Sequence, residues 1–513
     1  MKMILRALLA AFIGYVVYGF IKISRQFYKR FRMAEKIPGP PIEHRLLGHP
    51  SLALLEPKDI PKTVYQQYKE FGGIFRHWYA WVSFVFVAEA NYAELYFTSK
   101  SLEEKADMYK LFHDWLGQGL ITSNGALWHE RRKLITPAFH FNVLNALHET
   151  LVQNAIALVQ KLREHPKESP LDIYTVMHLV ALDNICESAM GIKIDALNNP
   201  KLDYIQAVED AAHAIAIRIG KPWFWNGLFY FTSTGRKLTS SLKKIFELSR
   251  KAILNSKNKK TATTEEQSGG EDDGIKVKRR LAFLDLLMEA HDSGTKPLSD
   301  EGLRDEVNTF IFAGHDTTAT SLSFTLFLLG IHPDVQEKCY REMDDIFQGS
   351  DRKPTADDLK AMKYLEQVIK ESLRMYPSVP IISRKVKEDV QFGKYTIPEG
   401  ATVALSIYCL HRDPKYFPNP NTFDPERFNS NNNTGRHPFA YVPFAAGARN
   451  CIGQKFALME EKIVVSYILR NFIIESLYGM DELEISFDMV LRSQRPLDVK
   501  LKPRSTNIDV IKI

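Results

Sequence analysis

The chain has 513 residues, 45% of them hydrophobic, and its net charge of +6 is spread along the sequence rather than gathered in bands. Charge of this size and distribution gives no case for nucleic-acid binding, which needs a basic stripe or patch. The length can bury a large core, and no internal repeat divides it. The four cysteines are far apart, which indicates a reducing compartment and argues against a disulfide framework: Cys186, Cys339, Cys409 and Cys451.

The N-terminus carries an apolar run from Ala7 to Ile21, which extends to about Met3–Ile23 if Arg6 and Lys22 snorkel. A cleaved signal peptide is the alternative to an uncleaved membrane anchor. The basic residues follow the apolar run, so the positive-inside rule favours an anchor whose flank stays cytoplasmic while the N-terminus crosses the membrane. That flank contains Lys22, Arg25, Lys29, Arg30, Arg32 and Lys36.

After this flank, Pro38-Gly39-Pro40-Pro41 ends the first helix and makes a stiff connector. Aromatic and β-branched residues from Gly73 to Val87 predict a pair of strands. Helical periodicity dominates from Asn91 through Arg341. The sequence therefore predicts a mostly α fold with a small β lobe.

Two stretches between the predicted helices have unusual compositions. Residues Pro222 to Phe231 are almost wholly aromatic or apolar, and two interpretations stay open: packing in the core, or contact with a bilayer interface, where Trp and Tyr are favoured. Residues 256–274 contain no apolar residue except Ala262. We predict a disordered surface loop over 256–274.

Glu306 to Leu329 predicts a long buried helix with Ala313-Gly314-His315-Asp316-Thr317-Thr318 at its centre. Glycine beside polar β-branched residues loosens the helical hydrogen-bond ladder and leaves backbone groups free to bind water or ligand. A Ser/Thr pair bonding back within a core helix is the simpler interpretation. A buried aspartate needs a stronger reason, because burying a charge is unfavourable.

Cys451 lies in a loop just before a helix-like run from Gln454 to Leu469. A thiolate at a helix N-terminus is stabilised by the helix dipole and by N–H groups. Gly447 permits a tight turn, Gly453 lets a flat ligand approach the backbone, and Arg449 can neutralise a carboxylate. These groups can hold haem iron by a cysteine thiolate. The alternatives are a buried structural cysteine and a zinc site, and the absence of a second nearby cysteine disfavours zinc.

The spacing Phe-x-x-Gly-x-Arg-x-Cys-x-Gly resembles the haem-binding loop of the cytochrome P450 family. Trp128 and Arg132, four residues apart on one helix face, resemble the family's Trp-x-x-x-Arg contact to a haem propionate, and Arg384 resembles the contact to the second propionate. The resemblance implies haem b with Cys451 as the metal ligand. The remaining cofactor contacts that it implies come from Phe444, Gly447, Arg449, Gly453 and Ala313.

The motif at the centre of the long helix resembles the family's oxygen-activation motif. The resemblance implies that Gly314 makes room for dioxygen, that Thr317 hydrogen-bonds during oxygen activation, and that Asp316 relays protons. It also implies a buried structural triad that locks the segment carrying the cysteine loop. The residues of that triad are Glu371, Arg374 and Arg427.

Three short segments look most like the family 4 branch, whose members typically hydroxylate fatty acids at or near the terminal carbon. The segments are Trp115-Leu116-Gly117, Thr136–Phe139 and Gly314–Thr318. Many members of that branch carry a glutamate directly before Gly-His-Asp-Thr-Thr, and this carboxylate becomes ester-linked to a haem methyl group. Here the position is Ala313, which has no oxygen to form such a bond. We therefore predict a non-covalent porphyrin.

The resemblance implies a membrane anchor over residues 1–36 and a haem-thiolate catalytic domain over 37–513. The implied activity is that of an oxidoreductase that inserts one oxygen atom of O2 into a lipophilic, fatty-acid-like substrate. Electrons would come from NADPH through NADPH–cytochrome P450 reductase, a separate chain because no dinucleotide fingerprint is present, with cytochrome b5 as a further partner. The predicted location is the endoplasmic reticulum membrane, with one span and a cytoplasmic catalytic domain. The alternatives are an isomerase or dehydratase of lipid peroxides, and a haem-binding sensor or carrier without turnover.

Overall fold

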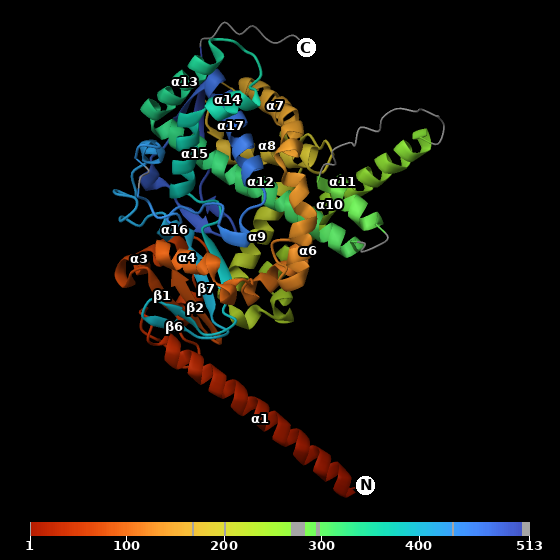
Figure 1. The fold of residues 1–513 in the computed structure, drawn as a ribbon, viewed down its shortest axis with the longest axis vertical. Coiled ribbons are helices and arrows are strands. Elements are labelled where there is room, and N and C mark those ends of the chain that lie inside the picture. Colours follow the sequence, from red (N-terminus) through yellow and green to blue (C-terminus); the bar gives the residue numbers. More distant parts are fainter. Residues whose placement is uncertain are drawn as a thin grey trace.

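The computed structural model describes residues 2–166, 169–199, 202–267, 283–293, 298–432 and 435–504. Helices form most of it, and strands gather in a small lobe at one end (Figure 1). The predicted class, mostly α with a small β lobe, is confirmed. The α-helices are α1 (Lys2–Ala34), α2 (Pro50–Ala53), α3 (Ile60–Phe71), α4 (Ala90–Thr98), α5 (His113–Leu116), α6 (Gly125–Ile135), α7 (Phe141–Glu164), α8 (Ile173–Ser188), α9 (Tyr204–Gly220), α10 (Ser233–Gln267), α11 (Phe283–Asp292), α12 (Asp300–Ile331), α13 (Pro333–Phe347), α14 (Ala356–Ala361), α15 (Lys363–Met375), α16 (Ile407–Leu410) and α17 (Gln454–Asn471).

The main sheet of the small lobe has the strand order β1-β2-β7-β4. β1 and β2 are antiparallel with Ile74 opposite Val87, which confirms the predicted strand pair. β7 runs parallel to β2 and antiparallel to β4, so a late segment of the chain completes a lobe begun near the N-terminus. The strands are β1 (Ile74–Tyr79), β2 (Val82–Val87), β3 (Leu171–Asp172), β4 (Ile381–Lys385), β5 (Val390–Phe392), β6 (Tyr395–Ile397), β7 (Thr402–Ser406), β8 (Phe472–Ser476), β9 (Ile485–Phe487), β10 (Leu491–Ser493) and β11 (Asp498–Pro503).

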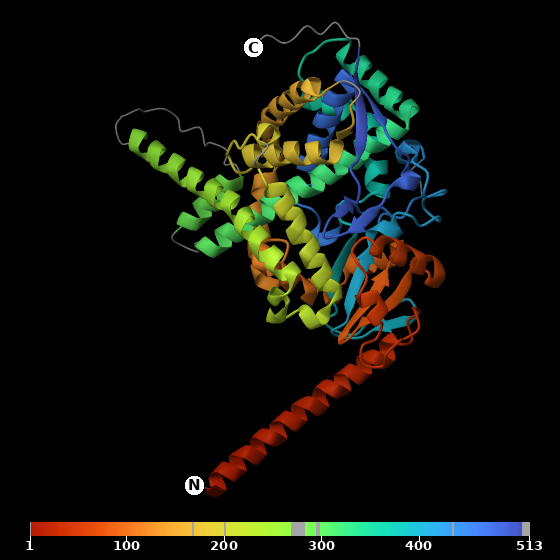
Figure 2. The same ribbon diagram turned by 180° about the vertical axis from the view of Figure 1, so that it is seen from behind.

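Helix α12 crosses the middle of the helical domain, as Figures 1 and 2 show from opposite sides. Its N-cap is Ser299, whose hydroxyl oxygen accepts a hydrogen bond from the Gly302 N–H. Helices α8, α10 and α17 pack around it. The side chains from 307 to 329 are therefore buried, except at three positions on one face: Ala313, Gly314 and Thr317. The predicted long buried helix is confirmed.

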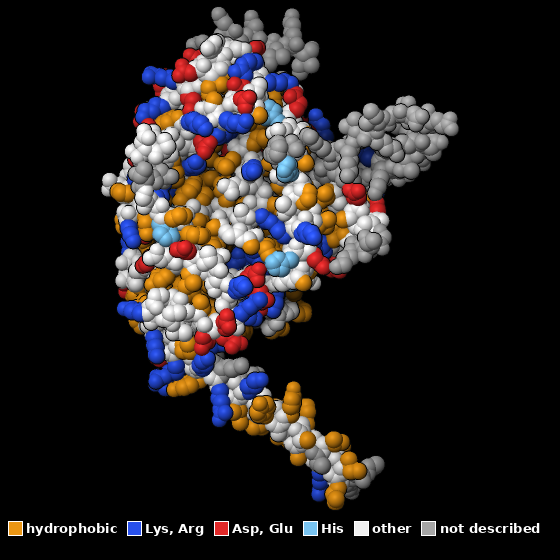
Figure 3. Space-filling view, in the orientation of Figure 1, with side chains coloured by type: hydrophobic (Ala, Val, Ile, Leu, Met, Phe, Trp, Pro, Cys, Tyr) orange, Lys and Arg blue, Asp and Glu red, His pale blue; other side chains and the backbone are white. Residues whose placement is uncertain are grey.

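Helix α1 projects away from the domain, and its C-terminal end lies beside the β lobe (Figures 1 and 2). Its stretch Met3–Lys22 has 20 residues and is long and apolar enough to cross a membrane. Large hydrophobic side chains there are exposed, and Figure 3 shows them along the outer part of the helix, with Lys and Arg nearer the domain.

The predicted disordered loop over 256–274 is wrong in its first part, because α10 continues to Gln267. The chain has no glycine or proline between Gly235 and Gly269, and Lys, Glu and Gln are good helix formers, so nothing in the sequence ends the helix earlier. Polarity alone was therefore a poor sign of disorder. Residues 268–274 of the predicted loop lie outside the described residues.

The aromatic stretch from Pro222 to Phe231 forms two short 3-10 helices between α9 and α10. Phe229 is buried in the core, whereas Leu228 is 62% exposed and Phe231 is 79% exposed. The stretch thus combines the two interpretations that the sequence left open. Phe229 packs in the core, whereas Leu228 and Phe231 face outward.

Candidate active site

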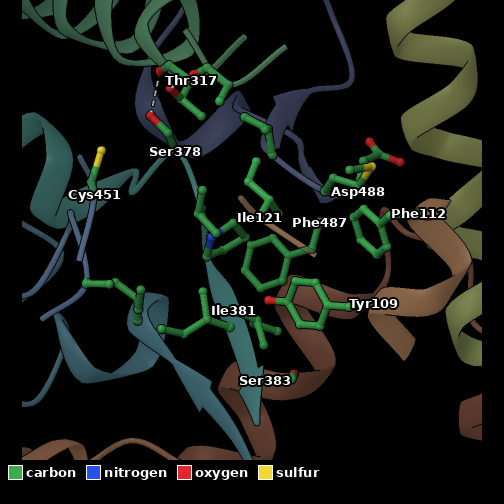
Figure 4. A pocket seen from close by; sticks show the side chains of 18 of the residues that line it. Tyr109, Phe112, Ile121, Thr317, Ser378, Ile381, Ser383, Cys451, Phe487 and Asp488 are labelled. Carbon is green, nitrogen blue, oxygen red and sulfur yellow. Dashed lines mark hydrogen bonds between the residues drawn. The ribbon is translucent and has the colours of Figure 1, made fainter. Parts of the chain in front are cut away.

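A cavity of about 450 Å³ lies between the centre of α12 and the loop before α17 (Figure 4). In Figure 4, Cys451 and Thr317 lie toward one end of it and Asp488 lies toward the other. Most of the predicted site residues line this one space: Trp128, Arg132, Ala313, Gly314, Thr317, Phe444, Arg449, Cys451 and Gly453. Asp316, Arg384 and Gly447 lie behind its wall.

The cysteine loop is held in a strained conformation that points Cys451 into the cavity. Ala445 and Gly447 have φ values of 55° and 68°, and a Cβ at Gly447 would lie 2.8 Å from the Phe97 carbonyl oxygen. The Cys451 N–H donates to the Phe444 carbonyl oxygen at 2.9 Å and closes the turn. The other three cysteines are buried, whereas Cys451 is exposed to the cavity.

The surroundings of Cys451 act on its pKa in opposite directions. Burial outweighs the other groups and raises the pKa of the Cys451 thiol, whereas the Gly453 N–H, the Arg132 charge and the Gln454 N–H act to lower it. Those groups are the ones that would stabilise a thiolate as a metal ligand. Within the described residues, no group of three or more His, Cys, Asp or Glu side chains could hold a metal ion. A metal at Cys451 therefore requires a cofactor that supplies the other ligands.

Positive side chains gather near the cavity on the side of the cysteine loop. Burial and the Arg384 charge lower the pKa of Arg449 to about 10, and burial together with Arg384 and Arg449 lowers the pKa of Lys105. No carboxylate among the described residues lies within 4 Å of these three cations. Arg384 Nη1 and Arg449 Nε are buried without a hydrogen-bond partner in that same part of the chain.

This arrangement fits a haem. Three crowded cations, two of which have a buried nitrogen without a hydrogen-bond partner, need an anion, and the two haem propionates provide two carboxylates. The Arg449 guanidinium also stacks on the Trp128 ring at 4.1 Å from its centroid, and its Nη1 donates to the Ser123 carbonyl oxygen at 2.9 Å. At Gly453 an added Cβ would meet no atom closer than 3.9 Å, so the backbone there is open to a flat ligand.

Arg132 contacts the cysteine loop directly. Its Nη1 and Nη2 donate to the main-chain and side-chain oxygens of Asn450, both at 2.8 Å. The sequence predicted a propionate contact for Arg132 and did not anticipate this second attachment. Lys105 was missed altogether, because a single lysine in a loop carries no pattern from which its spatial neighbours follow.

On α12, Gly314 is required first by helix packing. A Cβ there would lie 2.5 Å from Ile185 Cδ1 of α8, so the two helices could not approach as closely. Thr317 faces the cavity, and its hydroxyl donates to the Ala313 carbonyl oxygen at 2.7 Å. The Ser378 hydroxyl donates to the Thr317 carbonyl oxygen at 2.8 Å and fixes this turn from the opposite side.

Asp316 points away from the cavity into a buried cluster of polar side chains. Arg492 Nη2 lies 2.9 Å and 3.1 Å from its two carboxylate oxygens, and His178 Nε2 lies 3.3 Å from Oδ1. Burial alone would raise the pKa of Asp316, but Arg492 and His178 outweigh burial and hold it below its usual range. No sequence pattern pointed to Arg492, which is far away in the chain and lies in β10.

The predicted triad is assembled around Glu371 on α15. Its two carboxylate oxygens accept from Arg374 Nε at 2.7 Å and Nη2 at 2.8 Å, and Arg427 Nε approaches Oε1 at 3.3 Å. Arg374 also donates to three carbonyl oxygens of the irregular segment that leads to the cysteine loop: those of His411, Pro420 and Thr422. Glu371 and Arg374 are fully buried, so each charge depends on the other.

The fold and the site together define a protein that binds haem through one cysteine. Comparison with known proteins agrees: a family model described as cytochrome P450 matches residues 38–501. Cytochrome P450 4V2 of Homo sapiens is 40% identical over 499 residues, which cover 96% of this chain and 94% of that protein. Cytochrome P450 4c3 of Drosophila melanogaster is 36% identical over 503 residues, covering 96% and 94%.

Among solved structures, the heme domain of cytochrome P450DA aligns with a TM-score of 0.77 at 26% identity, covering 92% of this chain and 98% of that one. The chain therefore belongs to the cytochrome P450 family, and it is a haem-thiolate monooxygenase with family 4 relatives.

Removing the Glu371 carboxylate should prevent stable haem incorporation. Glu371→Ala leaves Arg374 as a buried charge without its partner, and such a loss typically destabilises a protein by about 3–5 kcal/mol. Haem content per polypeptide and urea unfolding measure the effect. Glu426→Gln, at a 43% exposed side chain of an ion pair with Lys338, is the control and should change stability by less than about 0.5 kcal/mol. A haem-replete, stable but inactive Glu371→Ala protein would contradict a structural role.

The haem should be released from the polypeptide by denaturing chromatography. Ala313 has no side-chain oxygen, and Asp316, the acid three residues on, is turned away from the cavity by Arg492. Ala313→Glu is the matched variant, because it puts a carboxylate on the cavity wall and should retain part of the haem with the protein. Haem absorbance that co-elutes with the wild-type chain would show that the interpretation of Ala313 is wrong.

Proposed function

We propose that this chain is a membrane-anchored monooxygenase that hydroxylates a lipophilic, fatty-acid-like substrate with electrons from NADPH. The observation that carries this proposal is the apolar wall of the cavity, since hydrocarbon is favoured in such a space. Part of this wall is supplied by helices α2, α3 and α9 and by the residues just after α2. These contribute Leu52, Leu55, Ile60, Val64, Ala216 and Ile219.

Haem iron bound by Cys451 supplies the oxygen chemistry, and the protein residues bind, orient and protonate. Trp128, Arg132, Arg384 and Arg449 would hold the propionates, with Lys105 as a further cation that the structure adds. The apolar wall keeps water away from the reacting carbon. The balance is one substrate C–H, one O2, two electrons and two protons, giving one alcohol and one water. Thr317 has its hydroxyl on the cavity wall, where it would orient a hydrogen bond for proton delivery.

The electrons require a donor from outside the cavity. We propose NADPH–cytochrome P450 reductase as that donor and cytochrome b5 as a second one. The test is a reconstituted mixture of the holoenzyme, reductase, NADPH and dodecanoic acid, with product identified by mass spectrometry. Hydroxylated acid formed in proportion to NADPH supports the proposal. Conversion of a fatty-acid hydroperoxide without reductase would favour the isomerase, and binding without any NADPH consumption would favour a sensor or carrier.

Thr317→Ala should bind haem and substrate but waste reducing equivalents as hydrogen peroxide. Positioned proton transfer is typically worth about 10²–10⁴-fold in rate, so product per NADPH should fall clearly. The control is Thr320→Ala: the Thr320 hydroxyl also bonds back along α12, to the Asp316 carbonyl oxygen at 2.8 Å, but Thr320 does not line the cavity. Equal coupling in both variants would show that Thr317 has no special part in proton delivery.

We further propose that α1 spans the endoplasmic reticulum membrane and that the segment between α9 and α10 dips into the same bilayer. The exposed Leu228 and Phe231 support this, because the segment between α9 and α10 that contains them lies at the end of the domain from which α1 projects (Figure 2). Apolar side chains exposed this far are favoured at a lipid interface.

Removing residues 1–36 should weaken membrane binding without abolishing it. The remaining affinity should then depend on Leu228 and Phe231, which supply buried apolar area at the interface. Co-sedimentation with phosphatidylcholine vesicles measures the bound fraction. Leu228→Ser/Phe231→Ser in the truncated chain should reduce that fraction further, whereas Leu254→Ser, at a 52% exposed leucine of α10, should not. Equal binding by all three truncated proteins would contradict the second contact.

A further inference from the structure

Helix α17 carries two adjacent glutamates, Glu460 and Glu461, which are 0% and 2% exposed. Their surroundings differ. Glu460 Oε1 accepts a hydrogen bond from Asn184 Nδ2 of α8 at 2.8 Å, and Glu460 does not line the cavity. Glu461 lines the cavity, as does Ser321 of α12. The two neighbouring glutamates therefore face different surroundings: Glu460 faces α8, and Glu461 faces the cavity.

The groups around Glu461 leave it without a compensating charge. Its Oε2 and the Ser321 hydroxyl, like Oε2 of Glu460, are buried without a hydrogen bond of normal geometry among the described residues, and the Ser321 hydroxyl is still close enough to Glu461 to act on its pKa. Tyr441 also approaches Glu461, but its hydroxyl donates to the Lys370 carbonyl oxygen. Lys462, the next residue, is bound to Glu366 at 2.8 Å. Unpartnered buried polar atoms on a cavity wall mark a place where water or a polar ligand binds.

A carboxyl group in such surroundings keeps its proton at neutral pH. Burial raises the pKa of Glu461 to about 8, and Ser321 opposes this rise. The acid is therefore protonated below about pH 8 and loses its proton above it. Asp316 is in the opposite state, since Arg492 and His178 hold it ionised and away from the cavity. A proton taken from Asp316 would first require that ion pair to separate.

We propose that Glu461 is a proton donor to the oxygen-reducing side of the cavity, acting through the Ser321–Thr317 face of α12. Ser321 and Thr317 are four residues apart, so they lie on one face of the helix, and both line the cavity. This inference rests on the monooxygenase function. Of the two protons that join one oxygen atom to form water, Glu461 supplies one, and it regains a proton from solvent before the next turnover. The electrons come from NADPH through the reductase.

The test compares Glu461→Gln with Glu460→Gln in the holoenzyme reconstituted with reductase, NADPH and dodecanoic acid. Glu461→Gln should slow NADPH oxidation at pH 7 by at least about tenfold, enlarge the solvent deuterium isotope effect, and abolish the fall in rate above about pH 8. Glu460→Gln should keep all three properties of the wild type, because Glu460 faces Asn184 instead of the cavity. Glu461→Asp should restore part of the rate.

A second measurement does not depend on turnover. Burial raises the pKa of both Glu460 and Glu461 to about 8, so two infrared C=O components of protonated carboxyls should titrate near pH 8 in the wild-type holoenzyme. Glu461→Gln should remove one of them and Glu460→Gln the other. Ser321→Ala removes the group that opposes the rise, so it should move the Glu461 titration to higher pH. The Ser321→Ala variant also tests the role of Glu461 if Glu461→Gln fails to bind haem.

Two results would overturn the proposal: an ionised Glu461 at pH 7, or unchanged NADPH oxidation and pH dependence in a haem-replete Glu461→Gln enzyme. Failure to hydroxylate dodecanoic acid would refute the substrate class alone. The infrared titration and the rate of NADPH consumption would still decide the role of Glu461.

Discussion

A cysteine thiolate inside a protein is stable only where N–H groups and positive charge compensate the free energy lost when the anion leaves water. Here those groups are the Gly453 and Gln454 N–H groups and Arg132, and all of them depend on the conformation of one loop. The rest of the structure holds that loop still. Arg132 donates to Asn450 inside it, while the Glu371–Arg374 ion pair fixes the irregular segment that leads into it.

Charge divides the cavity into two regions. On the side of the cysteine loop, Arg449, Arg384 and Lys105 crowd together without carboxylate partners, which suits the anionic edge of a haem. Elsewhere the wall is mostly apolar. Asp488 lies toward its far end, and the one carboxyl that α17 contributes, Glu461, is held neutral by burial. The ionised Asp316 is kept out of this space by Arg492. In this account the arginines and Lys105 bind the cofactor, and the neutral Glu461 donates protons.

The features that follow from local pattern could be predicted from the sequence: the strand pair at Gly73–Val87, the long helix over Glu306–Leu329, and the haem loop at Cys451. Features that depend on distant contacts could not. Arg492 meets Asp316 only because the β9–β10 hairpin folds back on α12, and Lys105 meets Arg384 across an isolated β-bridge between segments far apart in the chain. The prediction of a disordered loop was wrong in its first part for another reason. It rested on polarity alone, although no helix-breaking residue occurs before Gly269 and α10 continues to Gln267.

The account stands on Cys451 as the thiolate ligand of haem iron, and the absorption spectrum of the reduced, carbon monoxide-bound protein tests it most directly. The wild type should show the red-shifted Soret band of a thiolate ligand, and so should Cys186→Ala, Cys339→Ala and Cys409→Ala, because these buried thiols have pKa values raised by burial and face no cavity cation. Cys451→Ser should lose that band. A Cys451→Ser protein with the same red-shifted band would contradict the account.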